Sequence, residues 1–273
     1  MATVSIAAAL DAPYALTSQQ VASYRERGFV RLPHVLPAAL LDSYRDDIAR
    51  LIAEFRAHRP PLEERSTYDK AFLQMTNLWR SSDRVREFVY GKRLARIAAE
   101  LMGVAGVRLY HDQALFKEPG GGFTPWHADQ FYWPVSNDNV ITAWIPLVEV
   151  TMDMGPLAFA AGSHRLRDGR DLAISDESEA GLKARLQAFP LEQAPFALGD
   201  VSFHSGWTFH RAGANETGRM REVFTIIFMD QDIRLIEPRH DNHRADREAF
   251  APGIEVGEVI ASPLNPVLYA EAE

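Results

Sequence analysis

The chain has 273 residues, of which 47% are hydrophobic and 24% charged, and its formal net charge at pH 7 is −8. This length suits one large domain or two small ones, and the acidic charge argues against a nucleic-acid partner, which would require clustered Lys and Arg. The sequence contains no cysteine, so disulfides, zinc–thiolate sites and thiol nucleophiles are excluded, and any metal must be bound by histidine or oxygen ligands.

The N-terminal segment, residues 1–13, has no basic start and reaches Asp11 early, so it makes a poor signal peptide. No stretch of the chain approaches the about 20 apolar residues of a membrane span. We therefore expect a cytoplasmic protein with no membrane partner.

Helices are predicted in the first part of the chain. Thr17 and Gln20 fit a capping box at the start of a helix that would end near Gly28. Apolar residues recur at helical spacing over residues 37–55 and again over residues 82–102. The pattern predicts three helices.

After Gly106 the sequence changes character. Short segments rich in β-branched and aromatic residues are separated by Gly, Pro, Asn and Asp, which is typical of antiparallel strands. The segments are residues 107–117, 140–150, 157–161, 196–203 and 223–229. They predict an antiparallel sandwich or barrel with helices packed around it.

We expect one domain with a mainly helical part over residues 17–103, a β core over 107–230 and a C-terminal extension over 231–273. Residues 165–193 are polar and too numerous for a hairpin turn, which predicts a lid or insertion. His240 and His243 lie in the polar extension and are expected to be exposed to solvent.

A glycine-rich turn at residues 120–122 leads into the pair His127-x-Asp129. Along an extended chain, residues i and i+2 point to the same face, so both side chains can bind one ion. An imidazole and a carboxylate are two thirds of the facial triad that binds Fe(II) and leaves positions open for an oxo acid and O₂. Alone, such a pair is weakly diagnostic, because surface loops explain most occurrences.

A third ligand and an anchor for the oxo acid have candidates further along the chain. His204 and His210 lie six residues apart and would share one face of an uninterrupted strand, although Gly206 is expected to break that strand. Arg221 follows His210 by eleven residues, and a guanidinium can pair with the distal carboxylate of 2-oxoglutarate in bidentate geometry. Arg219 would share the same face, so spacing alone leaves both arginines and both histidines open.

Several short motifs occur in a characteristic order. They are PWHADQ at 125–130, TAWIPL at 142–147, GPL at 155–157, GSHR at 162–165, GDV at 199–201 and HRAGAN at 210–215, followed by Arg221. In these motifs the chain resembles the phytanoyl-CoA dioxygenase family of Fe(II)/2-oxoglutarate oxygenases. The resemblance covers roughly residues 17 to 230.

This resemblance implies a double-stranded β-helix, or jelly-roll, core with helices on its outer face. It implies His127, Asp129 and His210 as ligands of Fe(II), and Arg221 as the anchor of the co-substrate 2-oxoglutarate. By position in the family pattern, further residues would line the co-substrate pocket; they are Gln113, Thr142 and Trp144.

Candidates for the wall of the substrate pocket follow from position alone. They are Phe131, Tyr132 and Trp133, which directly follow the metal motif, and His164 of the GSHR motif. Core packing is the alternative for the aromatic residues, and capping of a turn is the alternative for His164.

The implied reaction is abstraction of a hydrogen atom from a small organic substrate, coupled to decarboxylation of 2-oxoglutarate to succinate and CO₂. Hydroxylation, epimerisation and cyclisation all begin in this way. Many relatives have Glu-Asn before GPL where this chain has Asp153-Met154, and the difference favours a tailoring enzyme of secondary metabolism over an acyl-CoA 2-hydroxylase.

Two alternatives from other classes remain. A cupin-like metal protein that works without 2-oxoglutarate would not need Arg221. A non-catalytic binding relative would have a broken set of ligands.

Overall fold

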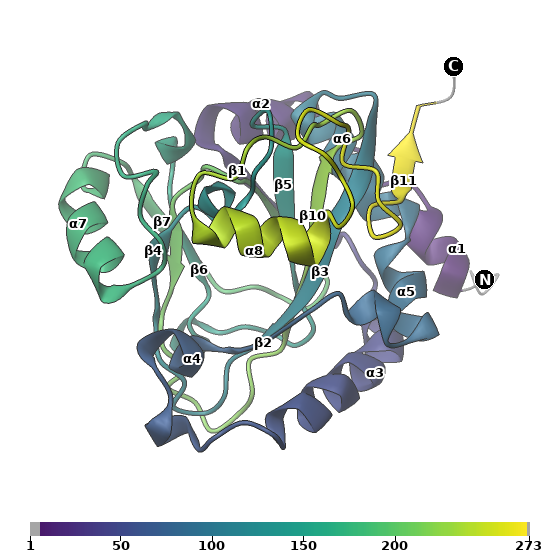
Figure 1. Cartoon of the computed structure of the whole chain (residues 1–273). Coiled ribbons are helices and arrows are strands. Elements are labelled where there is room, and N and C mark those ends of the chain that lie inside the picture. The colour runs from purple at the N-terminus through teal and green to yellow at the C-terminus, as the bar shows by residue number, and fades with distance from the viewer. Residues whose placement is uncertain (1–5, 272–273) are drawn as a thin grey trace.

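The computed structural model describes residues 6–271, which form two antiparallel sheets with helices around them (Figure 1). The helices are α1 Ile6–Asp11, α2 Ser18–Arg27, α3 Ala38–Arg56, α4 Thr67–Ala71, α5 Asp83–Val89, α6 Lys92–Met102, α7 Asp176–Leu186 and α8 Asp241–Phe250. The strands are β1 Phe29–Leu32, β2 Leu73–Thr76, β3 Gly106–Phe116, β4 Thr124–His127, β5 Val140–Pro146, β6 Leu157–Ala160, β7 Leu191–Gln193, β8 Val201–Ser205, β9 His210–Ala212, β10 Val223–Asp230 and β11 Val267–Ala270. Among the described residues, none of the helices has the length and apolar character that crossing a membrane requires.

The two sheets differ in size. The major sheet has the strand order β1-β8-β5-β10-β3-β11, with β2 beside β3, and the minor sheet has the order β4-β9-β6-β7. Neighbouring strands that are far apart in the sequence, such as β5 and β10, pair in antiparallel register. This arrangement is the jelly roll that the sequence predicts.

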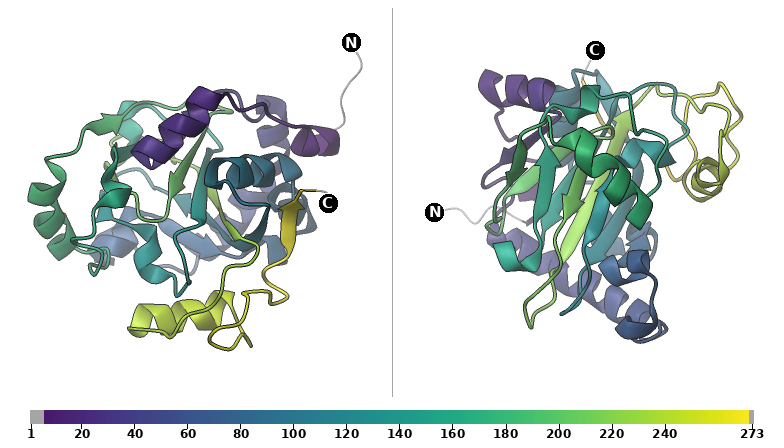
Figure 2. Two further views of the ribbon diagram at one scale, coloured as in Figure 1. Left: turned by 90° about the horizontal axis from the view of Figure 1, so that it is seen from above. Right: turned by 90° about the vertical axis from the view of Figure 1, so that its left-hand side faces the viewer.

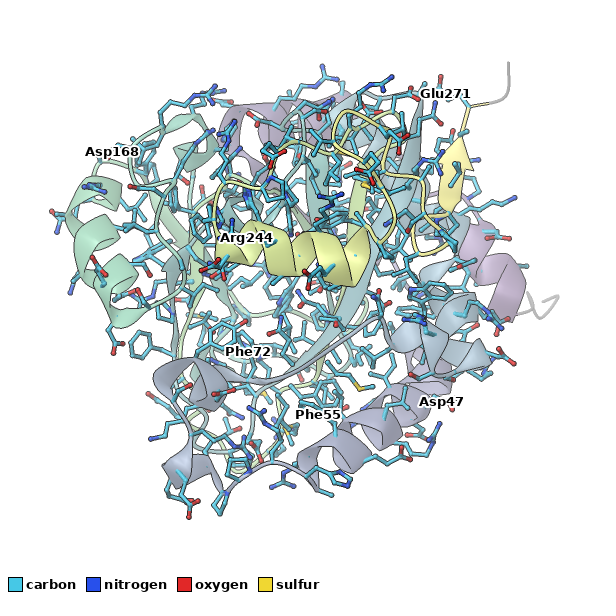
Figure 3. The ribbon with its side chains drawn as sticks, viewed as in Figure 1. Asp47, Phe55, Phe72, Asp168, Arg244 and Glu271 are labelled. Atoms are coloured by element: carbon cyan, nitrogen blue, oxygen red, sulfur yellow. The ribbon has the colours of Figure 1, made fainter. Side chains whose placement is uncertain are left out.

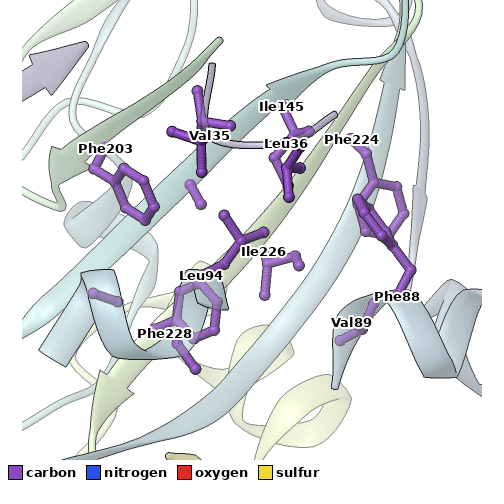
Figure 4. Packing of buried hydrophobic residues seen from close by; sticks show 14 of the residues in the cluster. Val35, Leu36, Phe88, Val89, Leu94, Ile145, Phe203, Phe224, Ile226 and Phe228 are labelled. Atoms are coloured by element: carbon purple, nitrogen blue, oxygen red, sulfur yellow. The ribbon is translucent and has the colours of Figure 1, made fainter. Parts of the chain in front are cut away.

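The largest hydrophobic core lies between the major sheet and the N-terminal helices. Phe203, Ile226 and Phe228 of the sheet lie near Leu94 of α6, and these side chains are almost fully buried (Figure 4). Farther along the sheet, Phe224 packs against Phe88 of α5, with ring centroids 5.7 Å apart. Because this face of the sheet is filled by apolar packing, polar side chains of the same strands that point the other way face the space between the two sheets.

The start and the end of α2 follow the prediction. Thr17 Oγ1 accepts a hydrogen bond from the backbone N–H of Gln20, whose side chain accepts one from the backbone N–H of Thr17. The helix ends at Gly28 with φ of 81°, where a Cβ would come within 2.4 Å of Nδ1 of His164. Glycine is needed here for both its positive φ and the close approach of that ring.

The single helix predicted over residues 82–102 is wrong. The structure has two helices, α5 and α6, separated at Tyr90 and Gly91. A Cβ at Gly91 would lie 3.0 Å from Cβ of Leu10, and the backbone N–H of Lys92 donates to Oδ1 of Asp11 over 3.0 Å. The new helix start is therefore capped by a residue about 80 positions away, which helical periodicity cannot reveal.

The strand predicted over residues 196–203 is also shorter than expected. Phe196 forms only an isolated bridge with Val150, and Gly199 turns the chain with φ of 98° before β8 begins at Val201. The strands β1, β4 and β9, which have three or four residues each, were not predicted. Such short strands leave little periodic signal.

The expectation that His240 and His243 are exposed in a polar tail is wrong. The extension contains α8, and the ring of His240 stacks on Phe131 with centroids 4.5 Å apart. His243 is buried, and its Nε2 lies 3.0 Å from the carbonyl oxygen of Phe131. The end of the extension adds β11 to the major sheet.

Within the predicted insertion, α7 packs on the outer face of the minor sheet. Glu179 accepts hydrogen bonds from the backbone N–H of Trp126 and from the guanidinium of Arg211, at 3.0 and 2.8 Å. Leu182 is fully buried in a cluster that includes Trp126. In the side view, α7 lies in front of the strands (Figure 2).

Candidate metal centre

Three predicted ligands come together between the sheets. One possible ligand atom from each of His127, Asp129 and His210 lies within 4.8 Å of the others. His127 ends β4 directly opposite His210, which begins β9. Ala128 is extended, with φ of −124° and ψ of 128°, so the i, i+2 relation places Asp129 on the same side as His127.

The hydrogen bonds of the two histidines fix which nitrogen faces the centre. Nδ1 of His127 lies 2.8 Å from the carbonyl oxygen of Pro125, and Nδ1 of His210 lies 3.0 Å from that of Thr208. A carbonyl can only accept, so each Nδ1 carries the proton and each Nε2 presents a lone pair. These Nε2 atoms lie 3.5 and 3.7 Å from Oδ1 of Asp129. Lone pairs directed at a carboxylate oxygen repel unless a cation lies among them, so the donor set fits a metal ion.

The protonation states also suit a metal. Burial, and then the neighbouring His127, hold the pKa of His210 well below its usual range. Burial acts to raise the pKa of Asp129, but His210, His127 and His204 outweigh it and hold that pKa well below its usual range. At neutral pH His210 is therefore a neutral imidazole and Asp129 an ionised carboxylate, the forms that bind metals.

The second oxygen of Asp129 is held by the major sheet. Oδ2 accepts hydrogen bonds from Oγ1 of Thr142 at 3.1 Å and from Nε2 of His204 at 3.2 Å. Thr142 and His204 are direct partners in the pairing of β5 with β8. The geometry therefore separates the competing histidines, because His204 contacts the carboxylate while His210 joins the ligand group.

Arg221 is 2% exposed and lines a cavity, here called the metal cavity, that His127, Asp129 and His210 also line. Its Nη1 donates to the carbonyl oxygen of Gly155 over 2.6 Å. Its Nε and Oγ1 of Thr225 are both buried and have no hydrogen-bond partner among residues 6–271. Burial lowers the pKa of Arg221 to about 10, so it remains charged at neutral pH. A buried guanidinium with one unpaired N–H and a buried hydroxyl without a partner fit the carboxylate end of a 2-oxo acid. Arg219, the competing arginine, is exposed.

The cavity has a volume of about 60 Å³ and brings together the predicted co-substrate residues. Gln113, Thr142 and Trp144 all line it with Arg221, and the ring centroid of Trp144 lies 5.9 Å from the guanidinium carbon. The structure adds residues that the sequence analysis did not assign to the site; they are Phe72, Gln74, His204 and Thr225. The sequence offered a clue to His204, because it lies an even number of residues from His210. It offered no clue to Gln74, which lies on the short strand β2.

Only two of the four predicted substrate residues line a cavity. Phe131 and Trp133 line a second, larger cavity of about 730 Å³. Tyr132 instead accepts a hydrogen bond from the backbone N–H of Ile174, and His164 packs against Gly28. Among the described residues, neither Tyr132 nor His164 lines either cavity. Figure 3 labels one lining residue of each, Phe72 for the metal cavity and Asp168 for the larger one.

A jelly roll with a His–Asp–His group and a buried arginine in one cavity defines a non-haem iron oxygenase that uses 2-oxoglutarate. Residues 24–223 match the sequence model of the phytanoyl-CoA dioxygenase family. Because the match covers more than half of the chain, the protein belongs to that family.

Two solved structures resemble the whole fold. The non-haem alpha-ketoglutarate-dependent epimerase SnoN from nogalamycin biosynthesis has a TM-score of 0.76 and 26% identity, with 93% of this chain and 96% of that chain covered. The carbocyclase SnoK from the same biosynthesis has a TM-score of 0.76 and 26% identity, with 94% and 99% covered.

A curated relative, the probable alpha-ketoglutarate-dependent hypophosphite dioxygenase of Stutzerimonas stutzeri, is 25% identical over 156 residues. That match spans 55% of this chain and about half of the relative, 54%. The predicted family, fold class, reaction class and cofactors are thus confirmed.

Proposed function

We propose that His127, Asp129 and His210 bind Fe(II), that Arg221 binds the distal carboxylate of 2-oxoglutarate, and that the site abstracts hydrogen from a small organic substrate. The observation that carries the proposal is the convergence of two unprotonated Nε2 atoms and Oδ1 of Asp129 beside a buried guanidinium with a free Nε.

The bound iron would supply the oxidising chemistry, using 2-oxoglutarate and O₂. The residues of this chain bind and orient. Thr142 and His204 occupy Oδ2 of Asp129 and so direct Oδ1 toward the metal. Arg221 and Thr225 would pair with the far end of the co-substrate, and the cavity walls exclude bulk water.

We propose oxidative tailoring of a secondary metabolite as the outcome, because the solved structures of an epimerase and a carbocyclase resemble this chain over 93% and 94% of its length. The cupin-like alternative without 2-oxoglutarate leaves the partnerless Nε of Arg221 unexplained. No partner beyond the small-molecule substrate, 2-oxoglutarate and O₂ is part of the proposal.

The test is an anaerobic titration of the metal-free protein with Fe(II) and then 2-oxoglutarate, following the visible charge-transfer band of the chelate. We expect the band in the wild type and its loss in His127→Ala. Arg221→Lys keeps the charge but loses the bidentate geometry, so it should need about 10 to 100 times more 2-oxoglutarate.

Arg219→Gln is the matched control, because this exposed arginine is two residues away and should leave the titration unchanged. If iron binds but no band forms at any concentration of 2-oxoglutarate, the co-substrate assignment is wrong. If Arg219→Gln and Arg221→Lys behave alike, the anchor is misassigned.

A further inference from the structure

Three hydrogen-bond donors line the metal cavity without an acceptor. Nε of Arg221 and Oγ1 of Thr225 have no partner among residues 6–271, and within the same part of the chain Nε2 of Gln113 donates to no acceptor. Gln113 lies directly opposite Thr225 in the pairing of β3 with β10, and all three residues line the cavity. A 2-oxo acid matches such a set, because its ionised carboxylates and its keto group are acceptors only.

The amide of Gln113 differs from the other two donors because its orientation decides what it presents. Arg221 is a donor in every orientation, and the hydroxyl of Thr225 rotates to suit its partner. Half a turn of an amide group exchanges its oxygen with its nitrogen. With the oxygen toward the cavity, Gln113 would repel a carboxylate, whereas with the nitrogen toward it, Gln113 would donate. Binding of the acid therefore depends on what selects the orientation of this amide.

The side chain of Gln74 holds the amide of Gln113. Nε2 of Gln74 donates to Oε1 of Gln113 over 2.6 Å, which occupies the oxygen and leaves the nitrogen for the cavity. Thr76 of β2 lies opposite Gln113, so Gln74 and Gln113 are diagonal neighbours across β2 and β3, within reach of long side chains. Gln74 is itself an amide, however, so its own orientation must also be selected.

Tyr68 ends this chain of hydrogen bonds. Its hydroxyl donates to Oε1 of Gln74 over 2.7 Å. A phenol donates better than it accepts, because a lone pair of its oxygen is delocalised into the ring, so Tyr68 favours the amide oxygen of Gln74 facing it. Burial, followed by Tyr132 and Asp129, raises the pKa of Tyr68 well above its usual range, so the hydroxyl keeps its proton.

The short helix α4 holds Tyr68 at the cavity. Oγ of Ser66 accepts from the backbone N–H of Asp69 over 3.1 Å at the start of the helix, and Asp69 forms an ion pair with Arg59. The ring of Tyr68 meets Phe72 edge to face, with centroids 5.4 Å apart, and Phe72 lines the metal cavity. Because α4 leads directly into β2 (Figure 1), one short segment carries both Tyr68 and Gln74.

We propose that Tyr68 and Gln74 are positioning residues for the co-substrate, which orient the amide of Gln113 so that its nitrogen donates to the bound 2-oxo acid. Donation runs from Tyr68 through Gln74 and Gln113 to the acid, so a change at Tyr68 reaches the acid only through Gln113. This inference rests on the proposed function for the identity of the acid, although binding of the acid can also be measured without iron.

The test is a double-mutant cycle on the affinity for 2-oxoglutarate. The affinity of the full chain is measured with Fe(II) through the charge-transfer band, under anaerobic conditions, and without metal by titration calorimetry. Tyr68→Phe keeps the ring against Phe72 but removes the terminal donor, so the affinity should fall about 3- to 10-fold. Tyr90→Phe is the matched control, because Tyr90 does not line the metal cavity, and it should bind as wild type does.

The same change in a second background separates positioning from packing. Gln113→Met keeps the length of the side chain without the amide and should weaken 2-oxoglutarate about 10-fold. Adding Tyr68→Phe to it should then change the affinity by less than about 1.5-fold, because the path to the acid is already interrupted. Gln74→Met interrupts the chain at its middle and should behave in the same way. This second cycle decides the matter if Gln113→Met does not fold.

The proposal is overturned if Tyr68→Phe binds 2-oxoglutarate as wild type does. It is also overturned if Tyr68→Phe weakens binding as much in the Gln113→Met or Gln74→Met background as in wild type, since Tyr68 would then act by packing of α4 alone. A wild type without the band, whose calorimetric affinity still depends on Tyr68, rejects the proposed function alone. A wild type with the band, whose affinity does not depend on Tyr68, rejects this inference alone. Absence of both band and calorimetric binding rejects both.

Discussion

The two sheets contribute to the centre in different ways. The minor sheet is built of strands of three or four residues, and β4 and β9 with the turn after β4 carry all three predicted ligands. The major sheet has strands of up to 11 residues. Its side chains hold Oδ2 of Asp129 and line one side of the metal cavity. On the short strands, backbone carbonyls accept hydrogen bonds from Nδ1 of His127 and His210 and fix the orientation of both rings. On the long strands, Thr142 and His204 orient the carboxylate of Asp129.

Two aspartates, Asp129 and the fully buried Asp112, sharpen this comparison. Asp129 next to the minor sheet faces histidines, and its pKa is held well below the usual range. Asp112 of β3 faces no histidine in this way: Oδ1 accepts from the backbone N–H of Leu78, and within the described part of the chain Oδ2 has no hydrogen-bond partner. Burial raises the pKa of Asp112 to about 7. At neutral pH the carboxylate of Asp129, beside the minor sheet, is ionised and can bind a cation. The carboxyl of Asp112, in the major sheet, holds its proton to a higher pH than usual.

The largest effect is expected from removing the carboxylate beside the minor sheet. Asp129→Ala should reduce bound iron from about one per chain to below about one tenth, because a facial triad without its carboxylate leaves two neutral ligands. Iron content after anaerobic reconstitution and desalting measures this. Full iron content in the variant would mean that Asp129 is not a ligand.

Removing the support from the major sheet should have a smaller effect. His204→Phe keeps a ring of similar shape but loses the donor to Oδ2, so affinity for Fe(II) should fall about 10- to 100-fold. His204→Gln, which can still donate, should recover part of that loss. Competition with a chelator gives the affinities, and equal behaviour of the two variants would show that His204 acts by packing alone.

A third effect concerns stability rather than iron. The folded-state pKa of Asp112, about 7, lies above its usual 3.8, so the native state holds the proton longer than the unfolded state. Its contribution to stability is present at low pH and is lost as the pH rises from about 4 to 7, by about 2 kcal/mol between pH 5 and 7.5. Asp112→Asn should lack this loss in urea unfolding measured across that range and should retain iron binding. An unchanged pH profile would contradict the assignment.

The smallest effect is expected at Thr225. Its Oγ1 is buried without a partner, so Thr225→Val should raise the free energy of unfolding of the protein without co-substrate by about 1 kcal/mol. The same change should weaken 2-oxoglutarate about 2- to 10-fold, because the hydroxyl would pair with the bound acid. If Thr225→Val raises the free energy of unfolding but leaves the affinity for 2-oxoglutarate unchanged or increases it, this hydroxyl has no role in binding the co-substrate.

The sequence predicts best what depends on neighbouring residues. The capping box at Thr17, the stop at Gly28 and the shared direction of His127 and Asp129 are all local relations, and the structure has each of them. Resemblance to the family added His210 and Arg221, and the structure places both beside the same cavity.

What sequence reasoning missed depends on distant segments. The break between α5 and α6 requires Asp11, and the role of His204 requires the register of β5 with β8. The buried position of His243 requires α8 to pack against the turn that carries Phe131. No periodicity within any one segment encodes these contacts, because each arises only after the chain has folded.

The loop 167–171 and the segment 236–243 line the larger cavity without supplying any of the three predicted ligands. Substitutions there are therefore separated from the predicted ligands and from Arg221, so one oxidising centre can be inherited unchanged while the lining of this cavity diversifies. The same separation recommends these two segments for randomised libraries in directed evolution, with residues 124–129 and 210–225 held constant.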